Sequence, residues 1–148
     1  MRLMLWTALV AFGCACGDNQ DPEGARALWQ SIHAQDYRAF QRAPGYETKR
    51  DSNAPHRDQV LIYINQRVAD ALSAGPTIDA WPEGSLIVKE GFDGSDLELV
   101  AVMEKRSTGW YWAEYDASGD PSYSGAPQLC TDCHRSGADY VRAFGFPQ

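Results

Sequence analysis

The sequence predicts an α+β domain in which a small antiparallel β-sheet has one helix before it and another after it. Two observations favour this fold class. Residues 59–116 contain short runs rich in β-branched and aromatic side chains, and glycine-containing turns separate them. Helical patterns, with apolar residues three or four positions apart, lie mainly toward the two ends of the chain. A length of 148 residues suits one such domain.

Each predicted element has a local signal in the sequence. The first helix can be capped by Asp21, with Pro22 at its first position, and it ends at the run Ala43-Pro44-Gly45. Residues 91–94 and 107–109 have the length and glycine content of hairpin turns. The predicted elements are a helix over 22–42, a loop over 46–57, a strand over 59–65, a helix over 66–73, strands over 85–90, 97–106 and 110–116, a loop over 117–127, a helix over 130–136 and a further helical turn or two within 138–144.

The charge of the chain excludes some classes of partner. It has 20 acidic against 13 basic residues, a formal net charge of −7. Nucleic-acid binding needs a basic surface, and so does electrostatic binding to an anionic membrane. We therefore expect neither nucleic acid nor a charged membrane surface as a partner.

The first residues have the pattern of an export signal. Arg2 supplies a positive charge, and an apolar run over 3–12 is too short to span a bilayer. A glycine and Cys14 then follow, which resembles a lipoprotein processing site. We expect an export signal over 1–13, Cys14 as the lipidated first residue of the mature protein, and a folded domain over 22–148. Cys16 is the second choice for lipidation, and ordinary cleavage to a soluble periplasmic protein is the alternative. Either way the expected location is the periplasmic side of a bacterial envelope. Any membrane anchorage would be by lipid only.

The motif Cys130-Thr131-Asp132-Cys133-His134 carries the chemistry. C-x-x-C-H is the attachment sequence of c-type haem. Two thiols three residues apart on a helical turn can meet the two vinyl groups at one edge of a porphyrin, and the adjacent imidazole then binds the iron. We therefore predict one covalent haem c per chain, held by Cys130 and Cys133, with His134 as the iron ligand on a C-terminal haem-binding helix.

Three alternatives to haem attachment fit the C-x-x-C-H motif less well. A thioredoxin-type C-x-x-C lies near an early strand–helix junction, whereas this one is close to the C-terminus. A structural zinc site needs four ligands, and only the distant His33 and His56 offer another imidazole. A disulfide across two residues is strained and would leave His134 without a role.

The late position of the motif limits the choice of a sixth iron ligand. No Met, His or Lys follows His134, so such a ligand must come from earlier in the chain. Met103 is most simply a core residue, His33 a packed or surface residue, and His56 a residue that caps or hydrogen-bonds a loop. Lys89 completes the candidates. The sequence favours a five-coordinate iron with an open face, which binds small molecules, over a closed one that mainly passes electrons.

Five segments of the chain form a characteristic series: PHRDQVLIYIN (55–65), WPEGSLIVKEGF (81–92), VAVMEKR (100–106), GWYWAEYDASG (109–119) and CTDCHRSGADYV (130–141). Together they resemble the cytochrome P-460 family, which includes the β-sheet cytochromes of the c′-beta type. The resemblance implies an antiparallel-sheet fold, one haem c per chain and a homodimer. It also implies a small diatomic or nitrogen-containing ligand: the P-460 enzymes oxidise hydroxylamine and carry a lysine cross-linked to the porphyrin, whereas the c′-beta members lack the cross-link and bind NO.

Two further residues are candidates for catalysis. Lys89 shares a strand face with Ile87 and can point inward, where it could carry the cross-link, or it can be a surface lysine paired with Glu90 or Glu104. Glu114 follows two tryptophans on its strand face and is either a partly buried proton acceptor or a solvent-facing residue. The alternative function is a six-coordinate electron-transfer cytochrome with Met103 as the sixth ligand. A redox partner protein is expected in either case.

Overall fold

The computed structural model describes residues 18–53, 55–75 and 77–144. The predicted export signal over 1–13, Cys14 and Cys16 lie outside the described residues. The elements are α1 (Pro22–Ala34), the short 3-10 helix η1 (Tyr37–Ala39), β1 (Gln41–Arg42), β2 (Arg50–Asp51), β3 (Gln59–Ile64), α2 (Gln66–Ala74), β4 (Leu86–Asp93), β5 (Asp96–Arg106), β6 (Gly109–Asp116), β7 (Pro121–Gly125) and α3 (Gln128–His134).

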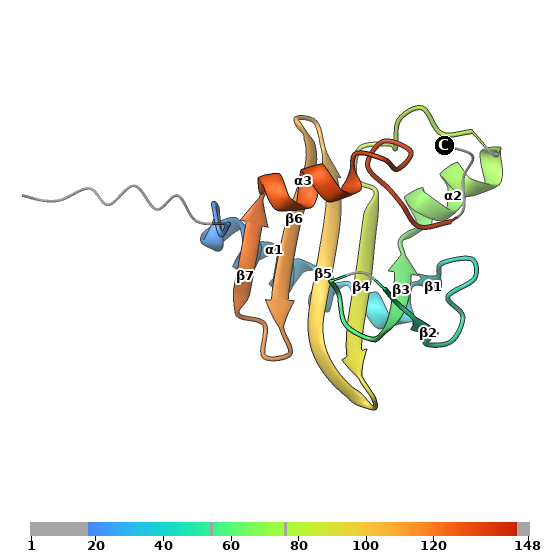
Figure 1. Ribbon diagram of the computed structural model, residues 1–148. Helices are drawn as coiled ribbons and strands as arrows, with labels where there is room; N and C mark the ends of the chain where they lie inside the picture. The colour runs from blue at the N-terminus through green and yellow to red at the C-terminus, as the bar shows by residue number, and fades with distance from the viewer. Residues whose placement is uncertain (1–17, 54, 76, 145–148) are drawn as a thin grey trace, which may run out of the picture.

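The strands form one antiparallel sheet in the order β1-β3-β4-β5-β6-β7, and β2 also pairs with β3. Helix α1 lies behind the sheet, whereas α3 crosses its front near the upper ends of the strands, with α2 to one side (Figure 1). The predicted α+β fold class, with a helix before the sheet and a helix after it, is confirmed.

Helix α1 covers one face of the sheet with an apolar stripe. Ala25, Leu28 and Ile32 recur at intervals of three and four residues and are all buried. They pack against the side chains that β3 to β6 direct backward, in a cluster with Tyr63, Leu86, Val88, Val100, Val102, Tyr111, Ala113 and Tyr115. The Asp21 side chain accepts a hydrogen bond from the Gly24 amide, so the predicted cap is confirmed.

A buried carboxylate joins η1 to the back of the sheet. Glu90 is only 2% exposed. It accepts hydrogen bonds from the hydroxyls of Tyr37 (2.8 Å) and Tyr63 (3.0 Å) and from Arg38 Nε (2.7 Å). Burial and the nearby carboxylate raise the pKa of both tyrosines, so both hydroxyls remain protonated donors.

The front of the sheet carries two cross-strand rows of side chains. Strand register aligns one row as Ile62, Lys89, Ala101, Glu114 and Tyr123. The adjacent row is Ile64, Ile87, Met103, Trp112 and Gly125. Because successive residues of a strand point to opposite faces, both rows point away from α1 and toward α3.

Four predicted elements were wrong in extent or kind. The predicted loop over 46–57 contains the two-residue strand β2, which pairs with β3. The first helix ends at Ala34 rather than at residue 42, because Asp36 adopts a left-handed backbone with φ 48° and a separate 3-10 turn follows. The predicted loop over 117–127 contains β7, whose Ser- and Gly-rich sequence carries no strand signal. Residues 138–144 form no helix; Ala138 and Val141 make an isolated bridge instead.

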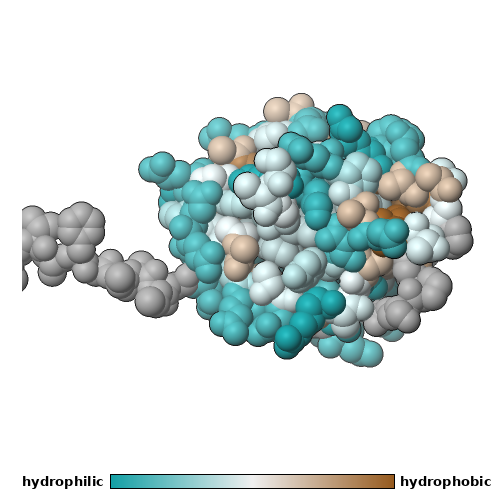
Figure 2. Space-filling model, turned by 90° about the horizontal axis from the view of Figure 1, so that it is seen from above, coloured by the Kyte–Doolittle hydropathy of each residue, from teal (hydrophilic) through white to brown (hydrophobic). Residues whose placement is uncertain are grey.

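The face of the molecule seen from above carries mainly hydrophilic and intermediate residues, and its apolar patches are small (Figure 2). Within the ranges that the structure covers, none of the α-helices has the length and apolar character needed to cross a membrane.

Candidate haem-binding site

Helix α3 carries the C-x-x-C-H motif across the front of the sheet. It contributes no fully buried residue of its own. Arg142 ties it to the C-terminal segment, because its guanidinium donates to the Cys133 carbonyl and lies 3.3 Å from the Cys133 sulfur. The motif is thus held over the sheet face by contacts from another segment.

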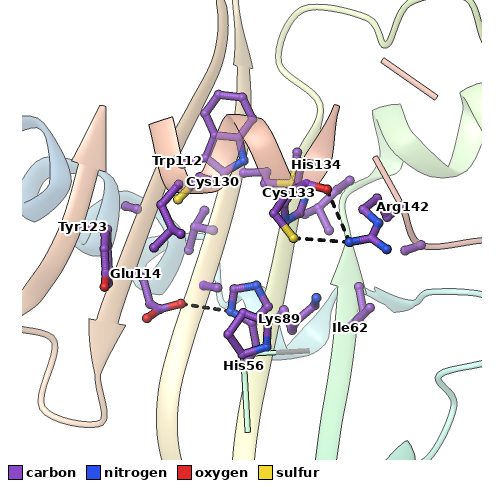
Figure 3. A pocket seen from close by; sticks show the side chains of 18 residues that line it. His56, Ile62, Lys89, Trp112, Glu114, Tyr123, Cys130, Cys133, His134 and Arg142 are labelled. Atoms are coloured by element: carbon purple, nitrogen blue, oxygen red, sulfur yellow. Dashed lines mark hydrogen bonds and ion pairs between the residues drawn. The ribbon is translucent and has the colours of Figure 1, made fainter. Parts of the chain in front are cut away.

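Two adjoining cavities separate α3 from the sheet. Their volumes are about 250 and 460 Å³. Figure 3 shows the first, with the sulfurs of Cys130 and Cys133 on one side and Lys89 and Glu114 of the sheet on the other. Residues that line both cavities are Pro55, His56, Ile62, Lys89, Cys133, His134, Arg142 and Ala143. The sheet row that begins at Ile62 therefore forms a wall of the site.

The imidazole of His134 is oriented for metal binding. Its Nδ1 lies 3.0 Å from the Tyr140 carbonyl oxygen, which can only accept, so Nδ1 carries the proton and Nε2 keeps its lone pair. Burial lowers the pKa of His134 to about 4, despite the opposing effect of this hydrogen bond. The ring is therefore neutral at neutral pH, which is the form that binds a metal.

The turn that presents the Tyr140 carbonyl is anchored to the sheet by Asp139. Its carboxylate accepts from the Trp81 backbone amide (2.9 Å) and from Lys105 Nζ (2.7 Å). Its backbone carbonyl accepts from Trp110 Nε1 (2.7 Å). These bonds set the position of the acceptor that orients His134.

We expect Asp139→Ala to lower the free energy of unfolding by about 2–3 kcal/mol, because Lys105 and the Trp81 amide lose a partly buried acceptor. Asp139→Asn should lose less, since it keeps an acceptor oxygen and tolerates the left-handed backbone at φ 43°. Chemical denaturation of both variants measures the difference. No measurable loss in Asp139→Ala would contradict the role given to the carboxylate.

The two cysteines are free thiols rather than a disulfide. Cys130 is partly buried, and this burial raises its pKa to about 11. A redox-active C-x-x-C instead requires a thiol of lowered pKa. The thioredoxin-type and disulfide readings of the motif are therefore less well supported than haem attachment.

Lys89 points into the site from β4 (Figure 3). It lies across the strand from Ile62 and Ala101, and burial lowers its pKa to about 8. Of the two surface partners considered from the sequence, Glu90 faces the opposite side of the sheet and Glu104 binds Arg106. The inward orientation considered for Lys89 is the one observed.

Glu114 lies in the same row and faces the same cavity. Its Oε2 is 2.9 Å from Nδ1 of His56, and the two side chains are 23% and 18% exposed. Glu114 is thus partly buried rather than solvent-facing. The structure brings Lys89, Glu114, Cys130, Cys133 and His134 to one site. The roles predicted for all five residues stay predictions.

Two residues of the site were missed or undervalued from the sequence. The hydrogen bond of His56 fits its predicted role in a loop, but its place in the cavity was not expected. Arg142 had no sequence signal. Of the other candidate ligands, His33 lies on α1, where it bonds the Trp29 carbonyl, and Met103 is buried beside Ile87, as a core residue would be.

The residues present fit a haem. Porphyrin supplies four nitrogen ligands, so the protein need supply only the axial one, and Nε2 of His134 is free for this role. Apolar side chains such as Ile62, Ile87 and Trp112 line the space beside it. Cys130 and Cys133 face the same space from α3.

This combination of an antiparallel sheet, a covering helix and a C-terminal C-x-x-C-H site defines a haem-binding α+β protein. The family comparison agrees, because the model of the family described as Cytochrome P460 matches residues 34–142, well over half of the chain. The chain belongs to the cytochrome P460 family. No curated protein and no solved structure matched it.

Proposed function

We propose that the protein is an exported c-type cytochrome that carries one haem, bound covalently through Cys130 and Cys133, and binds NO or a related small nitrogen species at the iron. The observation that carries this proposal is the cavity between α3 and the sheet, where His134 offers Nε2 beside both thiols. His134, Cys130 and Cys133 would hold the haem, which would supply an iron atom able to bind a small ligand.

The side chains that line the cavity would determine which small molecule can bind there. The apolar wall formed by Ile62, Ile87 and Met103 excludes water and favours a small, weakly polar molecule. Glu114 and Lys89 are polar groups of the same wall. They can accept a proton from a bound nitrogen ligand or donate a proton to it. The site thus combines an apolar enclosure with few polar contacts.

Titration of the reduced, haem-matured protein with NO and with CO tests the proposal. We expect each gas to shift the Soret absorption band at stoichiometric protein concentrations, because the iron accepts a sixth ligand. A spectrum unchanged by excess of either gas would contradict ligand binding and favour the electron-transfer alternative.

A second candidate function, hydroxylamine oxidation, is favoured by the position of Lys89. Its amine faces the cavity, and its lowered pKa of about 8 leaves a substantial neutral fraction near that pH. A neutral amine has the lone pair that a bond to a porphyrin carbon needs. That bond would replace one N–H and one ring C–H bond, so it would require a two-electron oxidant such as hydrogen peroxide. Mass spectrometry of the haem peptides should then show a third covalent link that Lys89→Ala removes. Haem attached through the two cysteines alone would leave ligand binding without this oxidation.

A further inference from the structure

His56 presents a second imidazole to the site, opposite that of His134. The centres of the two rings are 6.4 Å apart, and the ring planes make an angle of 69°. Both side chains line both cavities. They come from separate parts of the chain, since His56 lies between β2 and β3 and His134 ends α3.

This separation leaves room for one metal ion between the two imidazoles. A nitrogen–metal distance of about 2.0 Å on each side, and about 1.2 Å from each nitrogen to its ring centre, place the centres of opposed rings about 6.4 Å apart. The ring of Trp112 lies equally far from His134, at 6.5 Å, but an indole does not offer a comparable metal ligand. The distance between His56 and His134 therefore allows both rings to bind one metal ion, and the hydrogen bonds of the two histidines indicate which nitrogens would do so.

Hydrogen bonding leaves the same nitrogen free on each ring. Nδ1 of His134 donates to the Tyr140 carbonyl, and Nδ1 of His56 lies 2.9 Å from a Glu114 oxygen. A neutral imidazole has one donor and one acceptor nitrogen, so Nε2 of each carries the lone pair. A carboxylate bound to Nδ1 is a usual partner of metal-ligating histidines, because it fixes the ring and raises its basicity.

The backbone around His56 is held against the sheet. Its carbonyl oxygen packs on Gly91 of β4 so closely that a Cβ at position 91 would collide with it. The Ser52 amide donates to the Asp58 carbonyl (2.8 Å) and closes the loop, and Arg57 lies 3.6 Å from Asp93. The position of His56 is therefore determined by the fold rather than by an exposed, unattached loop.

Other candidate ligands are less well placed. His33 is on α1, on the opposite side of the sheet. Met103 lines the first cavity as part of its apolar wall, but it does not line the second cavity, which His56 and His134 also line. Lys89 lines both cavities and is the competing candidate. Among the described residues, no hydrogen-bond partner orients the Lys89 amine as Glu114 orients His56.

We propose that His56 binds the haem iron opposite His134 in the resting protein, and that an incoming small ligand displaces it. Glu114 is a positioning residue that holds the His56 ring through Nδ1. The inference rests on the proposed haem attachment and deepens the proposed function. It also changes the sequence expectation of a five-coordinate iron, because the incoming ligand opens the far face by exchange.

Optical and electron paramagnetic resonance spectra of the haem-matured ferric protein test this proposal. We expect a low-spin spectrum for the wild type and a high-spin spectrum for His56→Ala. Free imidazole added to His56→Ala should restore the low-spin spectrum, which a merely misfolded variant would not do. His33→Ala is the matched control, since it removes a histidine remote from the cavity and should retain the wild-type spectrum.

The rate of CO binding to the reduced protein gives a second readout. If His56 occupies the iron about nine-tenths of the time, His56→Ala should bind CO about tenfold faster, because all molecules are then ready to bind. Glu114→Gln should give an intermediate rate and a mixed-spin spectrum, since the amide holds the ring less strongly. Equal CO rates in all three proteins would overturn the proposal.

The spectra separate this inference from the proposed function. A high-spin wild type that His56→Ala leaves unchanged would overturn ligation by His56, and NO binding by that protein would still support the proposed function. A low-spin spectrum that is lost in Lys89→Met but kept in His56→Ala would overturn ligation by His56 and would favour ligation by Lys89. Low-spin character lost only in His56→Ala would support ligation, even if no form bound NO and the proposed function failed.

Discussion

Replacing both Cys130 and Cys133 by alanine is expected to abolish covalent haem attachment. The two thiols are the protein groups that face the cavity with a sulfur able to bond to a porphyrin vinyl group. Without them, haem can be retained only through His134 and apolar contacts, and denaturation releases it. Haem staining of the protein after denaturing electrophoresis measures the loss, which should be complete.

A matched variant tests whether this effect is specific to the sulfurs. Thr131→Ala with Asp132→Ala changes the two residues between the cysteines, which contact other helix residues at the surface rather than the cavity. It should retain the haem stain. Loss of the stain in this variant as well would indicate that α3 itself had been disrupted. Full staining of the double cysteine variant would refute attachment at this motif.

Replacing Glu90 by alanine is expected to lower the free energy of unfolding by about 3 kcal/mol, the largest loss of stability predicted for this protein. The carboxylate is 3% exposed, and its removal leaves the buried hydroxyls of Tyr37 and Tyr63 without their acceptor. Arg38 is 57% exposed and can be hydrated by water, so its lost ion pair adds little. Urea denaturation measures the change.

Glu98→Ala is the control for this stability loss. Glu98 also lies in the sheet, on β5, but its ion pair with Arg57 is long, 4.0 Å, and both side chains are 42% exposed. Its removal should change the free energy of unfolding by no more than about 0.5 kcal/mol. Similar effects of the two substitutions would show that the Glu90 cluster does not stabilise the fold as argued.

Local sequence predicted the elements whose residues carry their own signal. Strands β3 to β6 were found from β-branched and aromatic runs, and the start of α1 from Asp21 and Pro22. Strand β7 was missed, because Pro121–Gly125 forms a strand only by pairing with β6 and by its contacts to the start of the described chain, such as that between Ser124 and Asn19.

The helix side of the site could be predicted from local sequence, whereas the sheet side could not. The motif at Cys130, Cys133 and His134 lies within one short segment, so its spacing alone indicates haem attachment. The partner of Glu114 is His56, 58 positions away, and the row that includes Lys89 depends on strand register. A shift of one residue in that register would turn the row to the opposite face of the sheet.

The sequence by itself therefore determined the fold class, the family and the haem motif, because these depend on residue types and short spacings. Only the tertiary structure decided what faces the motif across the cavity. Sheet register placed Lys89 and Glu114 on its wall, and the close packing of a loop on Gly91 placed His56 opposite His134. Such contacts join distant parts of the chain, and their geometry exists only after the chain has folded.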